Sequence, residues 1–195
     1  MASDIYFSPV APARWCFLIT ARAQLDASKP KAWTCKLVLS NDNPQHQAFL
    51  DKLKQRFTDV HGTVKKRSDK GEPWKPDKTD PTKTVVKFKT LEFVREDGSK
   101  AAGPQIIDAK RQPWDGSGIG NGSELIIKFE ISAWDRKQEG VGISLHPKAV
   151  QVVKLVPRED EDATEGFDEV EGGYAVADAG GFVDEFAAGG EELGI

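Results

Sequence analysis

The distribution of charge divides the chain at Arg158, the last basic residue of the sequence. The 37 residues that follow contain 13 acidic residues and no basic residue. Their mixture of Asp, Glu, Gly and Ala offers too little apolar surface to offset the entropy lost on ordering, so this part is expected to be a disordered acidic tail. The residues up to Arg158 hold 27 basic and 18 acidic residues, a net charge of +9. The sequence therefore predicts a basic folded domain, residues 1–157, followed by a tail, residues 158–195.

Alternating apolar and polar residues predict that the domain is rich in strands. The period of two appears in residues 13–25, 32–40, 84–95, 104–112, 123–134, 141–145 and 150–156. This alternation assigns Trp15, Phe17, Phe88 and Phe129 to the core. A glycine-rich run, residues 116–122, precedes a strand pattern rather than a helix, so it is expected to be a turn or bulge and not a phosphate-binding loop.

A single helix is predicted after the second strand. Asn43 can cap it, Pro44 suits its first position, and Phe49, Leu53 and Phe57 recur at helical spacing. Six or seven short strands with one helix favour a small barrel over a βαβ fold, because no helical pattern alternates with the strands. The expected fold class is mainly β, an OB-like barrel of five to seven strands with one helix. A β-sandwich is the alternative.

Lysines and one aromatic residue are concentrated in the middle of the domain. Residues 63–83 lack an apolar period and are expected to form a long exposed loop, in which Pro73 and Pro76 would hold the Trp74 indole outward. Single-stranded nucleic acid requires this combination, because cations follow the phosphates and rings stack on the bases. The alternative is a solvated loop with Trp74 folded onto the domain. The predicted phosphate and base contacts are Arg14, Arg22, Lys36, Lys65, Lys66, Arg67, Trp74, Lys75, Lys87, Lys89, Arg111 and Trp114.

No catalytic residue, metal ligand or cofactor is predicted. Cys16 and Cys35 lie in strand patterns without Cys-x-x-Cys spacing, which indicates buried reduced thiols, and the three histidines are far apart in the sequence. The densest acidic cluster, residues 159–162, falls in the predicted tail, where a mobile cluster cannot preorganise a transition state. No apolar run approaches the ~20 residues of a membrane span, and the N-terminus lacks a signal-peptide pattern. A soluble cytoplasmic protein is therefore expected.

Several short motifs of the domain occur together in one known family. They are Thr20-Ala21-Arg22-Ala23, Pro73-Trp74-Lys75, Gly120-Asn121-Gly122-Ser123-Glu124-Leu125, Gly140-Val141-Gly142-Ile143-Ser144-Leu145 and Val150-Gln151-Val152-Val153, followed by the acidic tail. In these motifs the sequence resembles the phage-encoded single-stranded DNA-binding proteins of the replication OB-fold class. The resemblance implies sequence-independent binding and protection of single-stranded DNA in the host-cell cytoplasm, during DNA replication, recombination and repair.

The resemblance also implies a role for the tail. In the family the tail competes with DNA for the binding groove and contacts replication proteins, so a replicative DNA polymerase and a helicase or primase are the expected partners; a homodimer is left open. The best-known branch ends in an aromatic residue, whereas this chain ends in Ile195, which leaves Phe186 and Ile195 as alternative anchors. The residues expected to contact partners are Asp184, Glu185, Phe186, Glu191 and Glu192. Two other functions are open alternatives, a non-catalytic assembly factor and a metal-dependent nuclease.

Overall fold

The computed structural model describes residues 5–62, 68 and 70–158. By its internal contacts the chain divides into two units, Met1–Asp160 and Glu161–Ile195, and every described residue belongs to the first. The predicted tail contacts Asp184, Glu185, Phe186, Glu191 and Glu192 lie outside the described residues, as do Lys65, Lys66 and Arg67. The predicted domain division and the predicted role of the tail therefore stay predictions.

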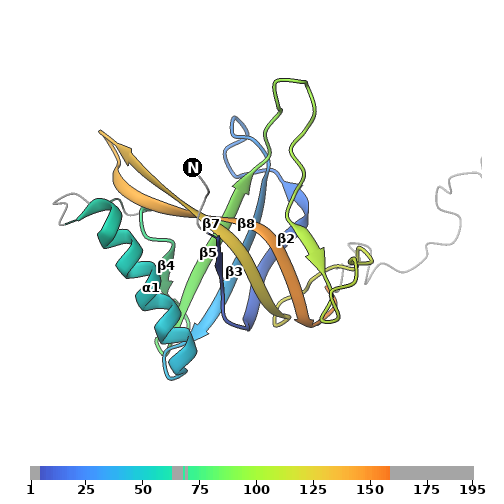
Figure 1. Ribbon diagram of the computed structural model, residues 1–195, viewed down its shortest axis with the longest axis horizontal. Coiled ribbons are helices and arrows are strands. Elements are labelled where there is room, and N and C mark those ends of the chain that lie inside the picture. The colour runs from blue at the N-terminus through green and yellow to red at the C-terminus, as the bar shows by residue number, and fades with distance from the viewer. Residues whose placement is uncertain (1–4, 63–67, 69, 159–195) are drawn as a thin grey trace, which may run out of the picture. The chain divides into compact units, whose positions relative to one another are not determined.

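The described residues form a mixed sheet of eight strands with one helix (Figure 1). Five strands are long: β2 (Ala11–Arg22), β3 (Ala32–Ser40), β5 (Lys83–Leu91), β7 (Glu124–Arg136) and β8 (Gly140–Lys154). Three have three residues each: β1 (Ile5–Phe7), β4 (Trp74–Pro76) and β6 (Gln105–Ile107). The strand order is β4-β5-β3-β2-β7-β8-β6, with β1 paired to β7; β6 runs parallel to β8 and the other pairs are antiparallel. The predicted mainly β fold with one helix is confirmed.

The sheet curls so that β5 and β8, which are not neighbours in the strand order, lie side by side. The imidazole of His146 on β8 hydrogen-bonds to the backbone of Lys89 on β5. The Ile143 N–H of β8 donates to the Gly71 carbonyl just before β4, at 2.9 Å. Gly71 and Gly142 permit this approach, because a Cβ on Gly142 would overlap both the Gly71 backbone and the Trp134 ring. These contacts close the sheet into a barrel-like body.

Helix α1 (Pro44–His61) begins as the sequence predicts. The Asn43 side chain accepts hydrogen bonds from the backbone N–H groups of Gln45 and His46, at 2.9 and 3.4 Å, and Pro44 is the first helical residue. The helix buries an apolar stripe that includes Phe49, Leu50, Leu53 and Phe57. This stripe covers the core, and no helix within the described residues covers the opposite surface of β2, β3 and β5 (Figure 1).

Phe129 of β7 lies at the centre of the core with no exposed surface. Its ring stacks on Tyr6 of β1 at a centroid distance of 5.7 Å, and meets Phe49 of α1 and Phe88 of β5 edge-on at 6.0 and 5.1 Å. The core positions predicted for Phe88 and Phe129 are confirmed. One ring thus joins two strands and the helix to β7.

The last two predicted strands are one. The sequence predicts separate strands at residues 141–145 and 150–156, yet β8 runs continuously through Pro147. A register shift in β7 between Lys128 and Phe129 lies opposite Pro147, so no ladder hydrogen bond is required from the missing N–H. Strand β4 also falls inside the predicted loop 63–83, since three residues are too few to show a period.

A bulge in strand β2 reverses which of its alternate residues face the core. Ala13 and Cys16 are both buried although they are three residues apart, and the register with β3 shifts between Arg14 and Phe17. The extra residue of this bulge turns Trp15 outward, where 56% of its surface is exposed. The core position predicted for Trp15 is therefore wrong, and Phe17 is only half-buried.

Candidate nucleic-acid interface

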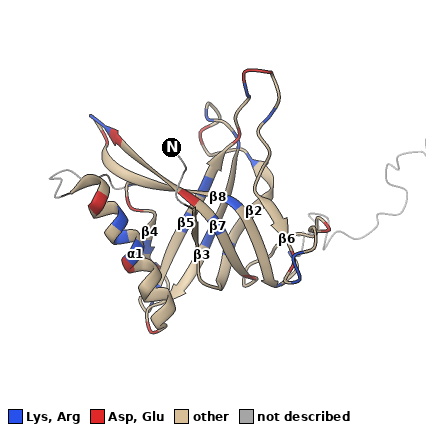
Figure 2. Ribbon diagram, in the orientation of Figure 1, with Lys and Arg blue, Asp and Glu red and all other residues tan. Residues whose placement is uncertain are grey.

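The outer face of β2, β3 and β5 collects basic side chains in register. Arg14 pairs with Lys36, and Lys36 pairs with Lys87 on the next strand. Phe17 pairs with Thr34 and Thr34 with Lys89 in the neighbouring row. Directly paired residues project from the same side of a sheet, so these cations lie together. Figure 2 marks the Lys and Arg positions along the ribbon in blue. We call this surface, with Lys75 of β4 at its edge, the cationic face.

The lysines of the cationic face repel one another. The pKa of Lys87 is lowered, first by partial loss of hydration and then by the charges of Lys36, Lys70 and Lys75. The pKa of Lys89 is lowered in the same way, by partial loss of hydration and by Lys87 and Lys29. A polyanion bound here would relieve this repulsion. The fold therefore holds positive charges together at a cost that an anionic ligand offsets.

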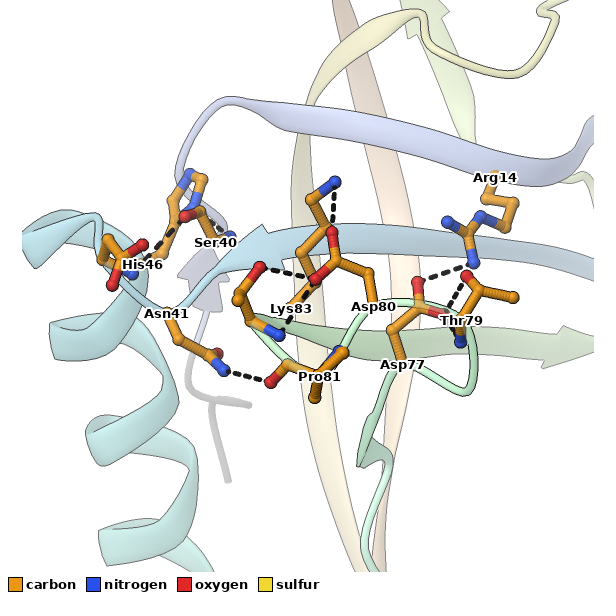
Figure 3. Close-up of polar contacts among 11 residues, drawn as sticks. Arg14, Ser40, Asn41, His46, Asp77, Thr79, Asp80, Pro81 and Lys83 are labelled. Atoms are coloured by element: carbon orange, nitrogen blue, oxygen red, sulfur yellow. Dashed lines mark hydrogen bonds and ion pairs between the residues drawn. The ribbon is translucent and has the colours of Figure 1, made fainter.

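Arg14 has a carboxylate partner. Its Nη1 lies 2.8 Å from Oδ2 of Asp77, whose side chain is only 2% exposed (Figure 3). The Thr79 backbone N–H and hydroxyl both donate to Oδ1 of Asp77 at 2.9 Å, and with Arg14 they lower the pKa of this carboxyl. Arg14 thus ties the loop before β5 to β2, and the net positive charge of the face comes mainly from the lysines.

Two arginines lie on the Phe17 ring. The guanidinium carbons of Arg22 and Arg158 are 4.1 and 4.5 Å from its centroid, within the range of cation–π contacts. Arg158 also donates from Nη2 to the Cys16 carbonyl at 2.7 Å. Arg158 was not among the predicted contacts, because the sequence places it at the start of the tail. Its only signal in the sequence is that it is the last basic residue.

The remaining predicted DNA contacts lie in different environments. Trp74 packs on the core and meets Phe57 edge-on at 6.2 Å, so the prediction that prolines hold it outward is wrong. Trp114 is partly buried against the core and donates its indole N–H to the Ser117 carbonyl at 2.9 Å. Arg111 is exposed in the connection between β6 and β7. Lys75 stands beside Val85 in the β4–β5 ladder.

The two cysteines are buried and free, as predicted. The pKa of Cys35 is raised, mainly by a hydrogen bond with the Cys16 thiol and secondly by burial. Within residues 5–62, 68 and 70–158, no group of three or more His, Cys, Asp or Glu side chains could hold a metal ion. The same part of the chain has no helix of the length and apolar character that a membrane crossing needs.

No family model matches the sequence, and a search of curated proteins finds no match. Several solved structures do match the fold. The structure of gp2.5, a single-stranded DNA binding protein encoded by bacteriophage T7, matches with a TM-score of 0.65 at 18% identity, covering 90% of this chain and 100% of that one. The single-stranded DNA-binding protein from bacteriophage Enc34 matches in its C-terminally truncated form with a TM-score of 0.60 at 13% identity, covering 77% and 85%.

The Enc34 protein also matches in complex with single-stranded DNA, with a TM-score of 0.57 at 11% identity, covering 77% of this chain and 86% of that one. At these identities the likeness concerns the fold. The resemblance predicted from the sequence motifs is confirmed at that level: the chain has the fold of phage single-stranded DNA-binding proteins.

Proposed function

We propose that the chain binds single-stranded DNA without sequence preference on the cationic face and protects it during phage DNA replication, recombination and repair. The observation that carries the proposal is the cluster of Lys36, Lys87 and Lys89 on two adjacent rows of β3 and β5, where partial loss of hydration and neighbouring lysine charges lower the pKa of Lys87 and Lys89. The solved complex of the Enc34 protein with single-stranded DNA supports the choice of ligand. No catalytic step is part of the proposal, and the host-cell cytoplasm is the proposed location.

The proposed phosphate contacts are the basic residues on or beside this face. They are Arg22, Lys36, Lys75, Lys87, Lys89 and Arg158, to which the sequence adds Lys65, Lys66 and Arg67 outside the described residues. Arg14 contributes by holding the loop that carries Asp77. Trp74, Arg111 and Trp114 stay candidate DNA contacts outside the cationic face.

Binding should depend steeply on salt. Six phosphate contacts by the described cations predict a slope of roughly −4 for log affinity against log salt, since single-stranded DNA gives about −0.7 per neutralised phosphate. The measurement is fluorescence anisotropy of a labelled oligothymidylate between about 50 and 300 mM NaCl, with a duplex of equal length as the control. Affinity indifferent to salt, a preference for duplex, or degradation of the oligonucleotide on addition of Mg²⁺ would contradict the proposal.

We further propose that residues 159–195 compete with DNA for the cationic face and recruit a replicative polymerase and a helicase or primase. Thirteen acidic residues in this segment complement the net charge of +9 before it. Arg158, the residue before the segment, packs on Phe17, so the described part of the domain ends beside the proposed DNA contacts.

Truncation after Arg158 is expected to raise affinity for single-stranded DNA by roughly 5- to 150-fold at low salt, the usual range for coupling between two ligands of one protein. The gain should shrink as salt screens the tail. The same anisotropy titration measures it, and full-length Phe186→Ala tests whether Phe186 anchors the tail. A truncated protein that binds no more tightly at low salt rules out competition.

A further inference from the structure

The bulge in β2 gives Trp15 an unusual backbone conformation. Its φ is 53°, in the left-handed region that bulky residues rarely adopt. Such a conformation is unfavourable for a bulky residue and persists only where the surroundings impose it. A single exposed aromatic residue needs no explanation, but an exposed Trp held in a strained conformation does.

Asn121 supplies the contact that holds this conformation. Its Oδ1 accepts the Trp15 backbone N–H at 2.8 Å, although the two residues are 106 positions apart. The N–H is left without a ladder partner by the bulge, so the Asn121 side chain replaces the missing strand contact. Trp15 therefore owes its position to a specific side chain and not to the sheet alone.

The turn that carries Asn121 is built to reach β2. Gly122 adopts a φ of 88° and donates its N–H to the Ala13 carbonyl at 2.8 Å. Gly120 lies so close to Val156 and Pro157 that a Cβ would approach the Pro157 carbonyl oxygen to 2.6 Å. The glycines on both sides thus let the turn sit against β2 with Asn121 directed at Trp15.

The surroundings of Trp15 suit a base with its phosphate. The next outward residue of β2, Phe17, carries Arg22 and Arg158 on its ring, which occupies that ring and fixes two guanidinium groups. Arg14 and Lys36 lie on the other side of the bulge. Among the five tryptophans Trp15 has the exposed ring, whereas Trp33 is buried and Trp74, Trp114 and Trp134 are half-buried.

We infer that Trp15 is the ring on which a base of single-stranded DNA stacks, and that Asn121 is the residue that positions it. The inference rests on the proposed function and adds to it a specific base contact, a residue that holds it, and a role for Phe17 as the support of two phosphate-binding arginines. Stacking on a ring tolerates any base, in agreement with binding that ignores sequence.

The test is an anisotropy titration of the full-length protein with oligothymidylate. Trp15→Ala is expected to weaken binding by roughly 5- to 150-fold, the value of one stacked base, and to leave the salt slope unchanged, because a ring releases no counterions. Trp15→Phe should restore most of the affinity. The matched control is Phe7→Ala, which removes a similarly exposed ring from β1, a strand that pairs with β7 and not with β2, β3 or β5.

The role of Asn121 is tested by a double-mutant cycle. Asn121→Ala should weaken binding in the wild-type background and change it little in the Trp15→Ala background, because it acts only through the ring. An equal effect in both backgrounds would overturn the positioning role. If the wild type binds with the expected salt slope and Trp15→Ala and Phe7→Ala have equal affinities, the stacking site is refuted and the proposed function stands. Absence of wild-type binding would instead refute the proposed function.

Discussion

The variant Lys36→Gln/Lys87→Gln/Lys89→Gln is expected to bind single-stranded DNA roughly 10³-fold more weakly than the wild type. About 1.5 kcal/mol for each hydrogen bond to a charged group sums to about 4.5 kcal/mol for three lysines. The salt slope should become shallower by about 2, because three phosphates are no longer neutralised. Both quantities come from one anisotropy titration series over salt concentration.

The fold should survive this loss of charge. The pKa values of Lys87 and Lys89 are lowered, first by partial loss of hydration and then by neighbouring charges, so their charged forms are disfavoured in the folded protein and neutral side chains remove both costs. We expect the urea midpoint of the triple variant to equal or exceed that of the wild type. A lower midpoint would mean that the lysines stabilise the sheet, and the loss of binding could then reflect unfolding.

The lowered lysine pKa values also give a pH signature. Wild-type affinity should fall as pH rises through the lowered pKa values of Lys87 and Lys89, below the value of about 10.4 at which ordinary lysines lose their protons. The triple variant should lack this early fall in affinity.

A matched control for the triple variant, Lys52→Gln/Lys54→Gln/Lys137→Gln, removes the same charge from the helix and the β7–β8 turn. Equal weakening by the control would show that net charge, and not the cationic face, determines binding.

Local signals were sufficient to predict the helix and most strands. The cap at Asn43 and the spacing of Phe49, Leu53 and Phe57 each act within a few residues, so tertiary contacts do not alter them. The limits of β3 match the prediction for the same reason, since Trp33, Cys35, Leu37 and Leu39 recur at every second position and are all buried. A basic domain with a mainly β fold therefore follows from short-range pattern and charge.

The position of Trp15 could not be predicted in this way. In β2 both alternate sets are apolar, with Trp15 and Phe17 on one side and Cys16 and Leu18 on the other, so alternation does not decide which set is buried. The decision depends on the bulge, where the Trp15 backbone N–H donates to the side chain of Asn121, more than a hundred residues away. The hydrogen bond from Arg158 to Cys16 joins residues 142 positions apart, so local pattern does not predict it either. Contacts between residues far apart in the sequence therefore place Trp15 and Arg158 at the candidate interface, where local pattern does not predict them.

Phe129→Ala is expected to reduce the free energy of unfolding by about 3 to 5 kcal/mol, the range for removing a fully buried phenylalanine. The loss is large because the ring contacts Tyr6, Phe49 and Phe88, so one cavity would loosen the contacts of β1, α1 and β5 at once. With a urea dependence of about 2 kcal/mol per molar, the midpoint should fall by roughly 2 M.

The control for this prediction is Phe7→Ala on β1, whose ring is 62% exposed and lies 5.9 Å from the Lys128 ammonium. Its effect should stay within about 0.5 kcal/mol, as for most exposed positions. The two variants remove the same atoms from strands that pair with each other, so their difference isolates burial. If Phe129→Ala unfolds at the same urea concentration as Phe7→Ala, the core of the barrel does not close around Phe129.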